Sequence, residues 1–243
     1  MRKILLSLAV ITALLGATSP AAAQSVDEIV AKNFKAKGGD KWKSIQAMRM
    51  TARITIQGME LPMTIVSKRP NLMRQDMSFQ GVSIVQAYDG TTAWTVNPMM
   101  GSDAASELPA AAAESMKEQA DFDGPLVDYK AKGNTVELLG KEQVEGSPAH
   151  KLKVTLKNGD VRTIYLDAEH FLQIKDEAKR SIRGTEVDTE TILGDYKEVG
   201  GMMFPHSIDS GQKGNPQRQK LVITKIELNV PIDDARFKMP EVK

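Results

Sequence analysis

The residues that could perform covalent chemistry in this chain lack the spacing that such chemistry needs. The three histidines, His150, His170 and His206, are scattered, without the His-x-x-x-His or His-Glu-x-x-His spacing of zinc sites. The sequence also has no Gly-x-Ser-x-Gly elbow and no phosphate-binding glycine loop. Adjacent carboxylates such as Asp233 and Asp234 are typical of turns and surface charge. We therefore predict no catalytic residues, no metal site and no cofactor, and a paired-carboxylate glycosidase site is the enzymatic alternative that stays open.

The first 23 residues have the organisation of a secretory signal peptide. Arg2 and Lys3 precede an apolar run over residues 4–17, and alanines at 21–23 form a small-residue cleavage site. The run is too short to span a bilayer, so an uncleaved anchor helix is the weaker alternative. We expect residues 1–23 to be removed and residues 24–243 to form one domain, soluble in the periplasm.

Composition excludes several further classes of function. Removal of Arg2 and Lys3 leaves 30 Lys and Arg against 31 Asp and Glu, a formal charge of −1, which argues against a nucleic-acid partner. The chain contains no cysteine, which excludes disulfides, thiol catalysis and an N-terminal lipid anchor.

Periodicity predicts a short helical start followed by a mainly β protein. Ser25 and Glu28 form a capping box, and the helix that follows ends at Gly38-Gly39. Asp40 can cap a second, short helix. From residue 48 the apolar period changes to two, which is typical of a half-buried strand.

An alanine-rich segment, Ser102 to Phe122, interrupts the strand pattern and favours helix. The strongest hairpin signal follows at Asn158-Gly159. There we expect Leu152, Val154 and Leu156 to face Val161, Thr163 and Tyr165, with Arg162 pointing outward. About ten or eleven strands result, more than a flat sheet usually holds, so we predict a strongly curved antiparallel sheet.

Many methionines lie on the apolar faces of the first predicted strands. Methionine is unbranched and polarizable, so a Met-rich surface can repack around varied acyl chains. The alternative is that these methionines fill gaps in an ordinary core.

Three sequence features together resemble a known family. They are the strand entry Lys68-Arg69-Pro70-Asn71-Leu72, the Asp89-Gly90 hairpin leading to Trp94 and Asn97-Pro98, and the ending Glu227 to Asp234 with Phe237 and Pro240. Their order and spacing resemble the periplasmic outer-membrane lipoprotein carriers, the LolA-like family, over nearly the whole chain after residue 23.

This resemblance implies an unclosed β-barrel whose apolar cavity is covered by the N-terminal helix and the mid-chain helical insert. Arg69 would be the latch that hydrogen-bonds the lid. The residues expected to line the cavity are Met48, Met50, Ile54, Ile56, Met63, Ile65, Met73, Met77, Trp94 and Met116.

The resemblance also implies a function without catalysis. The protein would be a monomeric carrier that binds the acyl chains of lipoproteins, or another lipid, received from an inner-membrane transporter and passed to an outer-membrane acceptor. A periplasmic lipid-binding sensor or regulatory module of the same fold is the alternative. An anchored acceptor is the third class, and the absence of cysteine argues against it.

Overall fold

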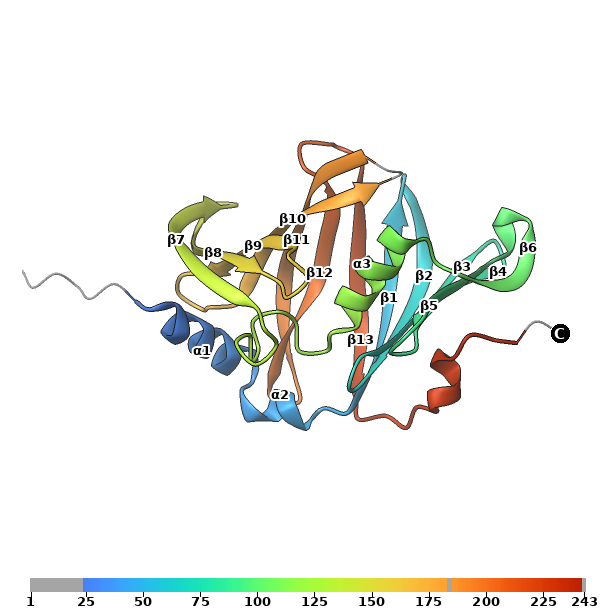
Figure 1. The fold of residues 1–243 in the computed structure, drawn as a ribbon, viewed down its shortest axis with the longest axis horizontal. Coiled ribbons are helices and arrows are strands. Elements are labelled where there is room, and N and C mark those ends of the chain that lie inside the picture. Colours follow the sequence, from blue (N-terminus) through green and yellow to red (C-terminus); the bar gives the residue numbers. More distant parts are fainter. Residues whose placement is uncertain (1–23, 183–184, 242–243) are drawn as a thin grey trace, which may run out of the picture.

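The computed structural model describes residues 24–182 and 185–241, so the predicted signal segment 1–23 lies outside the described residues. These residues form a thirteen-stranded antiparallel sheet that is strongly curved and unclosed, together with three α-helices (Figure 1). The helices are α1 (Val26–Lys37), α2 (Asp40–Ser44) and α3 (Ala110–Ala120). The strands are β1 (Ala47–Ile56), β2 (Met59–Lys68), β3 (Leu72–Phe79), β4 (Val82–Tyr88), β5 (Ala93–Asn97), β6 (Ser102–Glu107), β7 (Thr135–Val144), β8 (Ser147–Thr155), β9 (Val161–Asp167), β10 (Gln173–Ile182), β11 (Thr185–Val199), β12 (Met202–Gln212) and β13 (Arg218–Leu228). Two short 3-10 helices are η1 (Pro98–Met100) and η2 (Asp234–Phe237).

The strand order explains why a helix crosses the open side of the sheet. The order is β6-β5-β4-β3-β2-β1-β13-β12-β11-β10-β9-β8-β7, so the first and last strands pair at the centre. The chain runs outward from β1 to one edge at β6 and starts again at the opposite edge with β7. The connection between these edges, residues 108–134, therefore has to cross the sheet, and it carries α3 across the concave face (Figure 1).

The two N-terminal helices follow their sequence signals. Ser25 accepts a hydrogen bond from the backbone N–H of Glu28, whose side chain accepts from the Ser25 N–H, so the predicted capping box is present. Gly38 ends α1 with a φ of 127°, a conformation that favours glycine. The short second helix predicted at Asp40 is α2, and its Trp42 side chain is buried.

The helix predicted over residues 102–122 is shorter in the structure. Only Ala110–Ala120 is helical, whereas Ser102–Glu107 forms β6 at the edge of the sheet. β6 pairs with β5, and this pairing overrides the helical preference of its two alanines. This short polar strand has no apolar alternation, which explains part of the difference between the predicted ten or eleven strands and the observed thirteen.

The Asn158-Gly159 hairpin forms as predicted, but its faces differ from the prediction. Leu152 pairs with Ile164, and both are fully buried against α1 on the concave face. Side chains alternate along a strand, so Tyr165 lies on the opposite face and Arg162 on the same face as Ile164. The prediction that Arg162 points outward is therefore wrong.

Candidate functional site

An apolar cluster lies between α3 and the concave face of the sheet. We define the apolar cluster by its buried members, Ala52, Met63, Ile65, Met73, Tyr88, Ala93, Met116, Ala120 and Ile223. Met50 and Ile54 are partly buried and pack against it. Six of the residues that the sequence singles out for a cavity thus lie together, namely Met50, Ile54, Met63, Ile65, Met73 and Met116.

The other four predicted cavity residues are not members of the apolar cluster. Met48 packs beside α2, in a cluster with Trp42, Phe122 and other aromatic and aliphatic side chains. Ile56 and Met77 are partly buried in β1 and β3. Trp94 lies on the face opposite its neighbour in the apolar cluster, Ala93.

Trp94 is therefore not part of the surface beneath α3, and its placement there is wrong. Its side chain is 1% exposed, packs with Val85 and Ala87, and donates a hydrogen bond of 2.7 Å to the backbone oxygen of Phe237. The C-terminal segment with η2 covers this face of the sheet. Alternation along β5 puts either Ala93 or Trp94 on the concave face, and sequence alone does not show that the C-terminal segment covers the other one.

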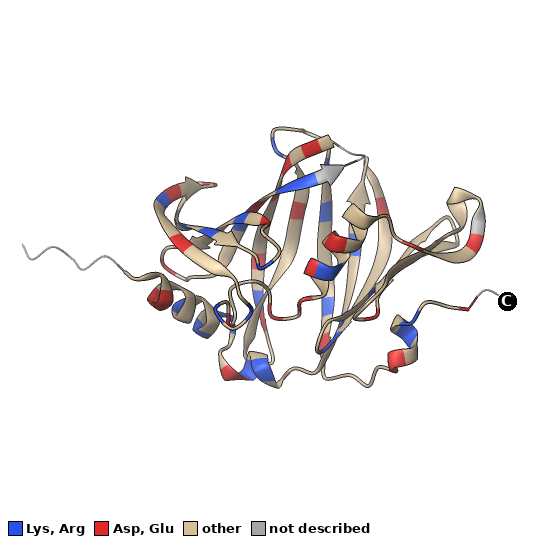
Figure 2. Ribbon diagram, viewed as in Figure 1, with Lys and Arg blue, Asp and Glu red and all other residues tan. Residues whose placement is uncertain are grey.

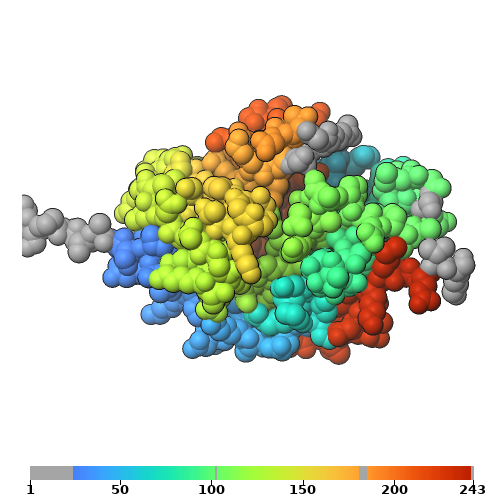
Figure 3. Space-filling view, in the orientation of Figure 1, coloured from blue at the N-terminus to red at the C-terminus, as the bar shows by residue number. Residues whose placement is uncertain are grey.

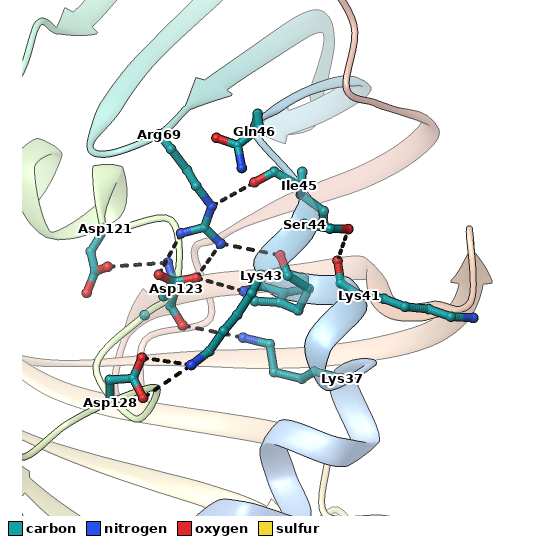
Figure 4. Close-up of polar contacts among 12 residues, drawn as sticks. Lys37, Lys41, Lys43, Ser44, Ile45, Gln46, Arg69, Asp121, Asp123 and Asp128 are labelled. Carbon is teal, nitrogen blue, oxygen red and sulfur yellow. Dashed lines mark hydrogen bonds and ion pairs between the residues drawn. The ribbon is translucent and has the colours of Figure 1, made fainter.

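Arg69 joins the sheet to the segments that follow α2 and α3 (Figure 4). It follows β2, and its Nε donates to the backbone oxygen of Ile45 at 2.6 Å, just after α2. Its two terminal nitrogens donate to the carboxylate of Asp123 at 2.7 and 2.6 Å, in the loop after α3. The guanidinium also lies 4.6 Å from the centre of the Phe122 ring. Arg69 thus contacts the residue that follows α2 and the loop that follows α3 at the same time.

The carboxylate of Asp123 is held in its ionised form by these contacts. Burial works to raise the pKa of Asp123, but the hydrogen bonds and charge of Arg69 outweigh burial, and the pKa lies below its ordinary value. Trp42 adds a further hydrogen bond from its Nε1 at 3.1 Å. The side chains of Arg69 and Asp123 are each about four-fifths buried. Solvent and salt therefore screen this ion pair less than they screen a surface pair.

A second set of ionic contacts joins α3 itself to the far half of the sheet. We call Glu118, Arg162, Asp176 and Arg180 the charge cluster. Arg180 donates to both oxygens of Glu118, at 2.9 and 2.6 Å, and Arg162 donates to Glu118 at 3.3 Å and to Asp176 at 2.9 Å. Charged positions of both signs lie on α3 and on β10 (Figure 2).

Two grooves open on either side of Glu118. One, of about 390 Å³, lies between α3 and the strand ends at Val161 and Arg180. The other, of about 630 Å³, lies between α3 and the β8–β9 hairpin, where Asn158 lines it. The space-filling view shows the surface hollowed between α3 and the β8–β9 hairpin (Figure 3). α3 therefore covers the concave face without sealing it along its whole length.

Sequence reasoning missed both acidic partners, Asp123 and Glu118. Asp123 is 54 residues from Arg69, and Glu118 is 62 residues from Arg180. The only sequence signal for Glu118 is an acidic residue two positions from an inward-facing methionine in an alanine-rich helix. That signal does not identify a partner across the sheet.

Comparison with solved structures identifies the fold. A DUF1329 family protein from Desulfovibrio piger has a TM-score of 0.62 at 12% identity and covers 89% of this chain and 98% of its own. A LolA superfamily protein from Nitrosomonas europaea has a TM-score of 0.59 at 13% identity, with the same coverage of 89% and 98%. An outer membrane lipoprotein-sorting protein domain from Vibrio parahaemolyticus has a TM-score of 0.58 at 11% identity and covers 86% and 94%. This chain therefore has the LolA-like fold.

Two other comparisons give no match. No family model matches the sequence, and no curated protein matches it. Across residues 24–182 and 185–241, no helix is long and apolar enough to cross a membrane.

Proposed function

We propose that this protein is a periplasmic carrier that binds the acyl chains of a lipoprotein, or of another lipid, between α3 and the concave face of the sheet. The observation that carries the proposal is the apolar cluster, in which methionines from β2, β3 and α3 meet on one side of an unclosed sheet. Each buried methylene of a ligand gains about 0.8 kcal/mol, so a few acyl chains bind strongly to such a surface.

The lid has the composition of an element that can be displaced. The first five residues of α3 are four alanines and a glutamate. The buried residues of the whole helix are Met116 and Ala120. Small side chains bury little apolar area and so contribute little to holding the helix down. The closed lid and the acyl chains compete for the same surface, which lets the carrier release its ligand.

Arg69 has the role of a latch in this proposal. Its hydrogen bonds to Ile45 and Asp123 hold the segments next to α2 and α3 in their closed arrangement. Donor and acceptor membranes then act by breaking and restoring these contacts, through an inner-membrane transporter and an outer-membrane acceptor.

A displacement assay tests the proposal. The protein without residues 1–23 is titrated with the neutral fluorophore N-phenyl-1-naphthylamine, which we expect to bind saturably and to be displaced by oleate. Met73→Trp enlarges a side chain in the apolar cluster and should weaken fluorophore binding, whereas Met99→Trp, at a side chain that is 57% exposed, should not. Binding only after partial denaturation, or equal effects of both variants, would contradict the proposal.

A further inference from the structure

The concave face is not apolar throughout. Asp176 pairs with Thr191 and Ala178 with Arg162 across β9, β10 and β11, and these side chains share the concave face. Thr191 contacts Ser210 through their hydroxyl groups at 3.0 Å. A polar patch on the concave face therefore lies beside the apolar cluster, as an amphiphile with apolar chains and a polar head would require.

The charge cluster is deeply placed for ionised groups. The side chains of Glu118 and Asp176 are 10% and 9% exposed, and those of Arg162 and Arg180 are 21% and 24% exposed. Burial raises the pKa of Asp176 above its ordinary value, although Arg162 acts against this. The Nε of Arg162 is buried without a hydrogen-bond partner. One donor of the cluster is thus unused while the lid is closed.

Glu118 is the member of the charge cluster that α3 contributes, whereas the other three belong to β9 and β10. When α3 moves away from the sheet, Glu118 moves with it. Two guanidinium groups and one carboxylate then remain, with a net charge of +1. Guanidinium groups present planar pairs of donors that match carboxylate and phosphate oxygens, and such contacts are stronger in a partly dry site than in water.

We propose that Arg162 and Arg180 form a headgroup site for an anionic lipid, whose phosphate or carboxylate takes the place that Glu118 occupies in the closed protein. This inference rests on the proposed function, because it assumes that the acyl chains lie on the neighbouring apolar cluster. The groove of about 390 Å³ beside Arg180 and Glu118 gives the rest of the headgroup a path to solvent.

Four ligands with the same oleoyl or oleyl chain test the headgroup site. Oleate carries a carboxylate and oleoyl-lysophosphatidylglycerol a phosphate, whereas oleyl alcohol and monooleoylglycerol are neutral. Each is titrated by displacement of N-phenyl-1-naphthylamine below its aggregation concentration. The quantity compared is the ratio of the affinity for an anionic ligand to the affinity for a neutral one. We expect this ratio to be about ten or more in the unmodified protein. The larger of the ratios for the carboxylate and the phosphate ligand shows which headgroup the site prefers.

Two variants that break the same ion pair separate a headgroup site from a lid contact. Arg180→Gln and Glu118→Gln both remove the Glu118–Arg180 pair, so both loosen α3 and both should raise the affinity for the neutral ligands. Only Arg180→Gln removes a headgroup donor, so we expect the preference for anions to fall about tenfold there and to persist in Glu118→Gln.

Arg218→Gln is the matched charge control. Arg218 is 22% exposed and binds Glu190 and Asp209, whose strand positions place them on the opposite, convex face. The Arg218→Gln protein should keep the preference for anionic ligands. Loss of the preference in Arg218→Gln as well, or equal ratios in Arg180→Gln and Glu118→Gln, would overturn the headgroup site and leave the carrier function in place. Failure of all four ligands to displace the fluorophore would instead overturn the proposed function.

Discussion

Arg69 connects three segments that are far apart in the sequence. It lies at the turn between β2 and β3, and it binds the end of α2 on one side and the loop after α3 on the other. Hydrogen bonds to a charged group contribute more than neutral ones, and here two of them share one carboxylate. One side chain thus ties the β2–β3 turn both to the end of α2 and to the loop after α3.

Replacement of this side chain should loosen the lid. Arg69→Leu removes the hydrogen bonds to Asp123 and leaves that carboxylate with fewer partners, so we expect a loss of about 1–3 kcal/mol in the free energy of unfolding and faster ligand exchange. Chemical denaturation and stopped-flow fluorescence measure the two effects.

Arg53→Leu is the control for this change, because Arg53 forms an exposed ion pair with Glu60 and contacts no lid segment through it. Exposed pairs contribute about 0–1 kcal/mol. Ligand exchange at the same rate in the Arg69→Leu protein and the unmodified protein would show that Arg69 is not a latch.

The individual residues show where prediction from sequence succeeds and where it stops. Five of the predicted cavity residues lie on strands and meet under α3, because period-two alternation fixes which side chains share a face, and Met116 joins them from α3 itself. Trp94 and Arg162 were assigned to the wrong faces, because alternation and a turn signal do not say which face is concave. That choice depends on which distant segment covers the strand, and here the C-terminal segment covers Trp94 and α3 covers Arg162.

At the scale of elements, α3 is held by two kinds of contact. Met116 and Ala120 pack into the apolar cluster, and Glu118 binds the two arginines of the charge cluster. The apolar contacts are those that a bound acyl chain would replace. The strength of the apolar packing therefore sets how much of the binding energy is used to open the lid.

Shortening Met116 should favour the open state. Met116→Ala removes a side chain that is 3% exposed, which costs about 2–5 kcal/mol where neighbours do not close the gap. We expect lower thermal stability together with tighter fluorophore binding, measured by melting and by titration. Met100→Ala, at a side chain that is 82% exposed, should change neither. Weaker binding in Met116→Ala would indicate that Met116 is a wall of the ligand site and not a competitor for it.

The elements differ in how far local sequence determines them. α1 follows from a capping box and a glycine stop, and β1 from ten residues of alternation. β6 could not be predicted in this way, because its alanines and serines carry no alternation and its strand state comes from pairing with β5. The helical insert was predicted because alanine-rich composition is a local signal.

At the scale of the whole molecule, the topology produces the lid. The chain enters the sheet at its centre with β1 and leaves it at the centre with β13, whereas the edge strands are β6 and β7. Because β6 and β7 follow each other in the chain, one connection has to cross the width of the sheet. That connection carries α3, and the same path brings Glu118 to β9 and β10 and Asp123 to Arg69. Sequence predicts a strongly curved antiparallel sheet from the number of strands, but the strand order comes from pairings across the full chain.

The central claim is that lipid enters beneath α3, and locking α3 to the sheet tests it most directly. Gln75 on β3 and Gln119 on α3 are joined by a side-chain hydrogen bond of 3.3 Å, and the chain has no cysteine of its own. Gln75→Cys with Gln119→Cys can therefore be linked by a short bifunctional thiol reagent. Glu142→Cys with Lys151→Cys, on neighbouring strands β7 and β8, provides the control link.

Binding of N-phenyl-1-naphthylamine and of oleate is then measured before and after linking. We predict that linking residues 75 and 119 abolishes binding, that linking residues 142 and 151 leaves binding unchanged, and that a cleavable reagent restores binding when it is cut. Undiminished binding with α3 fixed to β3 would contradict the account.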